Sequence, residues 1–201
     1  MRQVKYIFSI VLVALITLVS CERKTPATQQ WLLEDSLSLP GINPIGIGVF
    51  EDQFWLSDGD HNRLIAVNSL GQVQDSILGL DRPMHIDANA QGLWVPQYGS
   101  DTIAQFKLPS KSPLPLILKD SLDAPASIAV FGEERAIADF YNHRILYFNG
   151  ADWISIGTEG KDAGQFYYPT DVQITDQNIW VADAYNNRIQ LFDKRGTFVR
   201  M

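Results

Sequence analysis

The chain has 201 residues and a formal net charge of −7, with 23 acidic against 16 basic residues. A surface that binds nucleic acid needs a basic patch to neutralise phosphates, so an acidic chain argues against that class of partner. Hydrophobic residues make up 46% of the chain and there is one cysteine. We therefore expect a sizeable apolar core with no internal disulfide bond.

The first twenty residues have the pattern of an export signal. Arg2 and Lys5 precede an apolar run over residues 7–19. The ending "LVSC" (18–21) resembles the lipobox of bacterial lipoproteins, which implies cleavage before Cys21 and attachment of lipid to it. A membrane-spanning anchor is the alternative, but the apolar run is shorter than the ~20 residues that a span needs.

These features predict a processed and anchored protein. Residues 1–20 are the expected signal peptide, and residues 21–30 are the lipidated cysteine with a polar, flexible tether. Without residues 1–20 the chain keeps 14 basic against 23 acidic residues, a net charge of −9. We expect a lipid anchor in the bacterial cell envelope. Glu22 after Cys21, in place of Asp, favours the outer membrane, facing the periplasm or the exterior.

One sequence unit recurs four times in the same register after residue 40. Each unit begins at a proline, and eleven residues later a second apolar segment starts with Trp or Ala. Four short strands in about 42 residues are typical of a β-propeller blade. The predicted strands are apolar on both faces, which suits sheets packed between sheets. The anchoring prolines are Pro44, Pro83, Pro125 and Pro169.

The motifs "DAYNNRIQLFDKRGTF" (183–198) and "DFYNHRILYF" (139–148) resemble the NHL repeat, and the linker at 157–172 resembles the crossing between blades of that family. The resemblance implies an all-β propeller, usually of about six blades. We therefore expect residues 31–201 to be propeller, with four visible blades of a six-bladed ring and the rest outside this sequence. The segment 31–39 is expected to supply a strand to a further blade.

A polar motif recurs at the turn between the second and third strands of three units. An Asp ends the second strand, where it can accept N–H bonds from the following turn. Asn tolerates the left-handed conformation that such a turn needs. An Arg opens the third strand and can pair with a carboxylate. Recurrence in three blades indicates a structural role for these residues: Asp58, Asn62, Arg63, Asp139, Asn142, Arg144, Asp183, Asn186 and Arg188.

Two features depart from this motif. His61 and His143 lie in the same turns at offset positions and are expected to be turn residues, with a ligand role as the alternative. The second unit has Gln97 in place of the Asp and Thr102 in place of the Arg. Such departures mark either repeat drift or a functional position.

The residues just after each proline are expected to lie near the mouth of the central channel. The polar ones are the candidate binding residues: His85, Ser127, Thr170 and Asp171. A metal would need three or more ligands, so no metal site is assigned and a divalent cation at His85 and Asp171 stays an alternative.

No catalytic residues and no cofactor are assigned. The blade pattern also resembles peptidyl-hydroxyglycine lyase, but the His that this family places directly after the proline is missing in all four units. We expect a binding scaffold for a protein, peptide or glycan rather than an enzyme. The alternative is a metal-dependent lyase or hydrolase with its site at the channel mouth.

Overall fold

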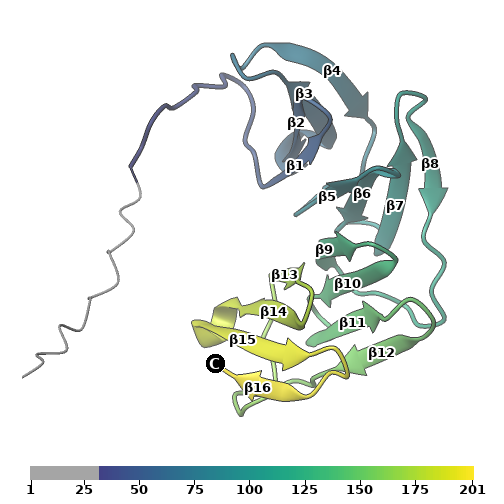
Figure 1. Cartoon of the computed structure of the whole chain (residues 1–201). Coiled ribbons are helices and arrows are strands. Elements are labelled where there is room, and N and C mark those ends of the chain that lie inside the picture. Colours follow the sequence, from purple (N-terminus) through teal and green to yellow (C-terminus); the bar gives the residue numbers. More distant parts are fainter. Residues whose placement is uncertain (1–31) are drawn as a thin grey trace, which may run out of the picture. The chain divides into compact units, whose positions relative to one another are not determined.

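The computed structural model describes residues 32–201. The predicted signal peptide, Cys21 and the tether lie outside these residues. By its contacts the chain divides into two units, Met1–Ser36 and Leu37–Met201. Within Leu37–Met201 the chain forms four antiparallel sheets of four strands each, which follow one another in chain order (Figure 1). The predicted all-β propeller of four-stranded blades is confirmed.

Each sheet is one blade, and the strands of a blade run in chain order from the innermost to the outermost. Blade 1 comprises β1 (Gly46–Phe50), β2 (Gln53–Asp58), β3 (Arg63–Val67) and β4 (Val73–Leu78). Blade 2 comprises β5 (Asp87–Asn89), β6 (Gly92–Gln97), β7 (Thr102–Lys107) and β8 (Ser112–Pro115). Blade 3 comprises β9 (Pro125–Phe131), β10 (Glu134–Asp139), β11 (Arg144–Phe148) and β12 (Trp153–Ile156). Blade 4 comprises β13 (Asp171–Ile174), β14 (Asn178–Asp183), β15 (Arg188–Asp193) and β16 (Phe198–Arg200).

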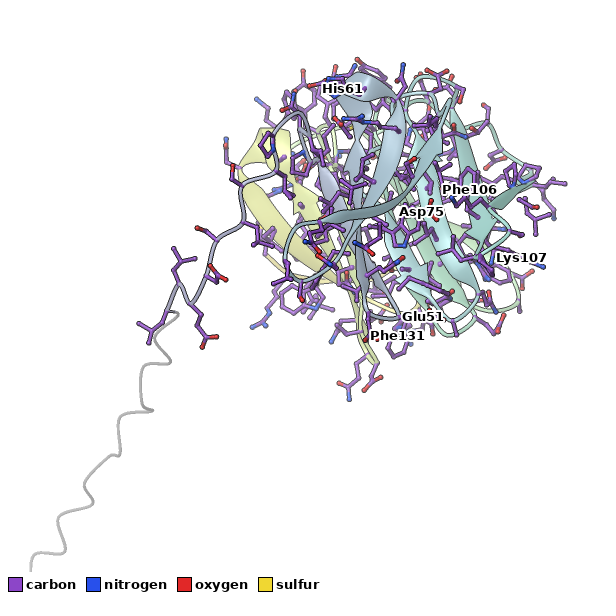
Figure 2. The ribbon with its side chains drawn as sticks, turned by 90° about the horizontal axis from the view of Figure 1, so that it is seen from above. Glu51, His61, Asp75, Phe106, Lys107 and Phe131 are labelled. Carbon is purple, nitrogen blue, oxygen red and sulfur yellow. The ribbon has the colours of Figure 1, made fainter. Side chains whose placement is uncertain are left out.

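The blades have two distinct ends. The inner strands begin at the end where the turns between second and third strands also lie, because neighbouring strands are antiparallel. We call this the entry end. Figure 2 shows His61 at this end, whereas Glu51, in the turn after β1, and Phe131, at the end of β9, lie at the opposite end.

Apolar side chains on both faces of the sheets form the core. Three clusters fill the three interfaces between consecutive blades, and each buries residues from second and third strands on both sides. Trp55 and Tyr147 are the largest fully buried side chains. This is the packing that strands apolar on both faces predict. The outward faces of blades 1 and 4 lack such a neighbour among the described residues and expose Ile47, Ile189 and Trp180.

Glycine allows the inner strands to approach closely. A Cβ atom on Gly46 would lie 2.7 Å from His85 Cα and 2.8 Å from the Met84 carbonyl oxygen. Real Cβ atoms essentially never come this close to backbone, so β1 reaches the start of blade 2 only because residue 46 has no side chain.

The strand expected at 31–39 is not formed in its described part, since residues 32–39 carry no regular secondary structure. A strand needs a neighbouring strand edge to satisfy its backbone, and the further blade that this segment was expected to join is not among the described residues. Leu39 and Ile42 pack instead against an apolar cluster of blade 1. Among the described residues, the helices are two short turns, Gly59–His61 and Ala184–Asn186, and none is long and apolar enough to cross a membrane.

Candidate functional site

A buried ion pair holds the segment that leads into blade 3. The Asp139 carboxylate at the end of β10 is fully buried. Arg144 Nε donates to Asp139 Oδ2 at 2.7 Å, and Arg144 Nη2 donates to the Ser121 carbonyl at 3.0 Å. The Asp123 N–H donates to Asp139 Oδ1 at 2.8 Å, and Asn142 Nδ2 donates to Oδ2 at 2.9 Å. We call this arrangement the blade clamp, because one carboxylate ties the entering linker to the strand turn.

Blades 1 and 4 repeat the clamp. Arg63 pairs with Asp58 at 2.8 Å and Arg188 pairs with Asp183 at 2.7 Å, and both carboxylates are fully buried. In blade 1 the His61 ring nitrogen, 2.8 Å from Asp58, takes the place that an asparagine amide has elsewhere. The arginines also donate to linker carbonyls at Gly41, Lys161, Asp162 and Gln165.

The clamp differs in detail from the turn that the sequence predicts. The N–H groups that the carboxylates accept come from linker residues about 15 positions upstream, such as Asn43 and Tyr167, and not from the following turn. The left-handed position is the residue just before each Arg. It is occupied by Asn62, Asn187 and also His143, with φ between 51° and 55°. Asn142 and Asn186 instead donate from their side-chain amides to the clamp carboxylate.

The environment of Asp58 stabilises its charged form. Burial raises the pKa of this carboxyl, but hydrogen bonds from His61, Arg63 and the Asn43 N–H outweigh burial, and the pKa lies below its usual value. Asp58 is therefore ionised at neutral pH, as a partner of an Arg must be.

Blade 2 carries a neutral version of the clamp. Gln97 Oε1 accepts the Asp81 N–H at 3.1 Å, and Gln97 Nε2 donates to Thr102 Oγ1 at 3.3 Å. The linker N–H is thus satisfied as in the other blades, with no buried charge. Gln97 replaces the Asp and Thr102 replaces the Arg, so both charges of the pair are absent and the two side chains still bond to one another.

His143 has a packing role. Its side chain is buried, its Nδ1 accepts the Tyr168 N–H at 3.1 Å, and its ring stacks on Tyr167 at 5.5 Å with an interplanar angle of 7°. Because Nδ1 accepts this bond, the ring hydrogen sits on Nε2. The residue fixes the linker into blade 4.

Three of the predicted channel-mouth residues converge from three blades. Ser127 Oγ donates to Asp171 Oδ1 at 2.5 Å, and His85 Nδ1 lies 3.7 Å from Asp171 Oδ2. The latter distance is too long for a direct hydrogen bond but suits an ion pair with a protonated imidazole. Thr170 is not part of this group, since its hydroxyl and its N–H both face the Ala182 carbonyl of its own blade.

The backbone fixes His85 between blades 2 and 3. The His85 N–H donates to the Ala126 carbonyl at 3.1 Å, and the His85 carbonyl accepts the Ile128 N–H at 3.3 Å. His85 and Ser127 therefore form a parallel bridge across the blade boundary. The position of the imidazole relative to Ser127 and Asp171 is set by main-chain bonds, and not by a flexible loop.

Asp87, two residues after His85, is a neighbouring carboxyl that the sequence analysis missed. Burial raises its pKa, and the charge of Asp171 adds to this effect, although the Val130 and Ala88 N–H groups act against it. Two carboxyl groups from blades 2 and 4 thus influence one another near the channel. The signal was present in the sequence, because alternate residues of an extended segment lie on the same side, and Asp87 follows His85 by two residues.

A cavity of about 390 Å³ opens at this group. Its walls include Ile45, Gly46 and Leu56 of blade 1 together with His85 and Asp171. One side is therefore apolar, and the other offers an imidazole and a carboxylate. Within residues 32–201 no three His, Cys, Asp or Glu side chains are arranged to hold a metal ion. Ser127 donates to Asp171 and not to His85, so the group lacks a hydroxyl poised against an imidazole base.

Six aromatic side chains gather at the entry end, and the sequence analysis did not identify them. Each lies within two residues after a clamp position or before a blade proline, which is a signal that the repeat register could have given. Their ring centroids lie 4.5–6.2 Å apart in a continuous series of contacts. We call this set the tyrosine face: Tyr98, Phe140, Tyr141, Tyr167, Tyr168 and Tyr185.

Comparison with known families supports the NHL-type repeat. Residues 166–192 match the NHL repeat. This range contains the blade 4 clamp and the strands β13 and β14. The resemblance predicted from the sequence is thus confirmed for an NHL-type β-propeller. No curated protein matches the chain.

The chain resembles solved structures of several different proteins. The chain resembles a streptogramin B lyase (18% identity, TM-score 0.64, covering 81% of this chain and 55% of the lyase). It resembles a chain of a nidogen–laminin complex (16% identity, TM-score 0.65, covering 80% and 64%). It also resembles hydrazine synthase from Kuenenia stuttgartiensis (14% identity, TM-score 0.60, covering 85% and 52%). The chain thus spans less than two thirds of each of these structures, and at such identities the likeness shows the fold alone.

Proposed function

We propose that this protein is a membrane-tethered, extracytoplasmic binding scaffold that receives a protein, peptide or glycan ligand at the entry end of its propeller. The observation that carries the proposal is the convergence of His85, Ser127 and Asp171 from three blades beside a cavity of about 390 Å³. Ligand sites are typically concave and mostly apolar, with a few convergent polar groups. This cavity has that composition.

The tether follows from residues outside the described part of the chain. The export signal and the lipobox-like "LVSC" (18–21) support lipid attachment at Cys21 and a place in the bacterial cell envelope, facing the periplasm or the exterior of the outer membrane. The polar segment 22–30 would then leave the propeller free to meet a partner near the membrane surface.

The chemistry of the mouth favours binding over catalysis. A carboxylate held by a serine hydroxyl and faced by an imidazole can accept hydrogen bonds and pair with a cation. The carboxylate of Asp171 is half exposed, so a ligand can reach it. Its partners Ser127 and His85 are fixed by backbone bonds, so the group is ordered before a ligand arrives.

Binding to immobilised peptide and glycan arrays would test the proposal. We expect at least one ligand whose binding falls about tenfold on Asp171→Asn or His85→Ala and is unchanged by Asp152→Asn, a control carboxylate in the turn between β11 and β12 at the opposite end. Ligands bound equally by all variants would refute an entry-end site.

Metal analysis of the purified protein separates the two functions predicted from the sequence. Protein that binds its ligand without a stoichiometric metal supports the scaffold. A stoichiometric divalent ion that is lost on His85→Ala would instead support the metal-dependent lyase or hydrolase.

A further inference from the structure

The tyrosine face is a surface feature and not part of the core. None of its six residues belongs to the apolar clusters between blades, and Tyr141 and Tyr185 are 48% and 59% exposed. The rings come from blades 2, 3 and 4 and meet mostly edge to face, as between Phe140 and Tyr141 with centroids 5.0 Å apart. Exposed and contiguous aromatic surface of this kind marks an interaction site.

Acidic residues occur on the chain segments next to these rings. The Tyr141 N–H donates to the Asp123 carbonyl, and the Gly99 N–H, next to Tyr98, donates to the Asp81 carbonyl, so both acids lie on segments bonded to the face. Burial and the neighbouring Tyr167 raise the pKa of the Tyr168 phenol, and the charge of Glu159 adds to this rise. The segments 79–82, 98–101, 116–124 and 157–168 together carry six acidic and three basic side chains. The segments next to the aromatic rings therefore carry a net charge of −3, from six acidic and three basic residues, and one of these acids, Asp120, pairs with Arg144.

The face already holds one cation of its own chain. The Arg82 guanidinium lies over the Tyr98 ring, 4.9 Å from its centroid. The clamp arginines cannot do the same, because Arg144 and Arg188 are bonded to carboxylates and linker carbonyls. Burial, together with the hydrogen bond to Tyr141, raises the pKa of Tyr98 to about 12, so this ring meets a cation as a neutral phenol. The attraction is then that of a cation for a ring face.

We propose that the tyrosine face binds a peptide segment that carries arginine or lysine side chains. The inference rests on the proposed binding function and names the partner's chemistry at the same end of the propeller. The rings supply flat apolar surface and cation–π contacts, and the acids on the neighbouring segments supply charge complementarity. An extended segment with proline between its cations fits such a surface, because aromatic-lined grooves take preformed extended chains at low entropic cost.

Fluorescence anisotropy with two matched peptides would test this on the purified protein. The first probe is a fluorescein-labelled peptide of alternating Arg and Pro, and the second has citrulline at every Arg, which keeps the shape and removes the charge. We expect the arginine peptide to bind at least about tenfold more tightly, with the advantage shrinking as salt is raised. Equal binding of the two peptides would overturn the proposal. This test uses the unmodified protein and needs no variant.

Variants of the face locate the binding. Tyr141→Ala and Tyr185→Ala should each weaken binding of the arginine peptide by about 3- to 10-fold. Tyr141→Phe, which keeps the ring, should bind like the unmodified protein. The matched control is Phe131→Ala, because Phe131 is also an exposed aromatic with a cation over its ring, Lys194, but lies at the opposite end (Figure 2). An equal loss in Phe131→Ala would show non-specific attraction and refute the face.

The two proposals fail differently. If the arginine peptide does not bind, but an oligosaccharide or another array ligand binds and responds to Asp171→Asn, the binding scaffold stands and the cationic partner is wrong. If no array ligand responds to any entry-end variant, both proposals fail.

Discussion

Moving the neutral clamp of blade 2 into blade 3 gives a direct measure of what the buried ion pair contributes. The changes are Asp139→Gln and Arg144→Thr, singly and together. Arg144→Thr leaves the Asp139 carboxylate, fully buried, with two neutral donors and no cation. Breaking a buried pair by removing one partner costs about 3–5 kcal/mol, and the remaining donors and the 19% exposure of Arg144 reduce this to about 2–3 kcal/mol.

The double variant should cost much less than the sum of its parts. Asp139→Gln alone leaves Arg144 without its carboxylate, but this guanidinium reaches water and a linker carbonyl, so we expect a loss of about 1–2 kcal/mol. With both changes no buried charge remains, and Gln can accept the linker N–H as Gln97 does in blade 2. The loss should then be about 1 kcal/mol, which makes the coupling between the two sites about 2–4 kcal/mol.

Urea unfolding followed by tryptophan fluorescence measures these free energies, provided that the slope with denaturant is the same for all variants. Arg195→Thr is the control, because Arg195 is 86% exposed and pairs with Asp193 at the surface, where a change within about 0.5 kcal/mol is expected. Additive losses in the double variant, or a cost of Arg144→Thr no larger than that of the control, would refute the clamp as an energetic unit.

Three further outcomes are expected. Gly46→Ala places a Cβ 2.7 Å from His85 Cα and should lower the free energy of unfolding by about 1–3 kcal/mol. Gly48→Ala in the same strand is the control, because the nearest atom to its Cβ is 3.4 Å away and the free energy of unfolding should change little. Equal losses of the two variants in urea unfolding would contradict the close approach at Gly46. Asp58 has a lowered folded pKa, so its stabilisation is full above the ordinary value of 3.8 and is lost as pH falls through the folded value. Thermal unfolding of Asp58→Asn should therefore lose less stability on acidification than the unmodified protein, and parallel pH profiles would argue against a lowered pKa. Cys21→Ser should abolish lipid labelling and move the protein from the membrane to the soluble fraction after cell fractionation, and retention in the membrane would favour a spanning anchor.

The sequence predicted the blades well because their signals are local and repeated. The distance from each proline to the second strand fixes which residues pair, as with Asp171 opposite Ala182. The expectation that 31–39 supplies a strand to a further blade stays a prediction, because the described residues hold no such blade for it to join. The sequence also predicted which residues form the clamp. It did not predict their hydrogen-bond partners, because the Asp123 N–H that Asp139 accepts lies 16 residues upstream in the linker.

The candidate site shows the same limit. His85, Ser127 and Asp171 could be placed near one another from the register alone, because each lies two residues after a blade proline. The contacts themselves could not be predicted. Ser127 donates a hydrogen bond to Asp171 and His85 lies 3.7 Å from Asp171, because of the distances between the inner strands of three blades. The tyrosine face was not predicted because contacts such as that between Tyr98 and Phe140 form only between blades, although the repeat register places every ring close to a clamp position or a blade proline.

The unit that departs from the repeat also carries the cation that lies on the tyrosine face, Arg82. Blade 2 has Thr102 where the other blades have the clamp arginine, and its linker is held by neutral hydrogen bonds, such as those from the Asp81 N–H to Gln97 and from the Arg82 N–H to Asn62. Arg82 of that linker turns over Tyr98 and occupies a ring that a partner's arginine could use.

Arg82→Ala should therefore tighten binding of the arginine peptide by about threefold, because it uncovers a ring and removes a like charge. Anisotropy titrations of this variant against the citrulline peptide give the control, whose affinity should change less. Weaker binding of the arginine peptide would mean that Arg82 contacts the partner's acidic or carbonyl groups instead. The cationic partner would then be the wrong reading of the face.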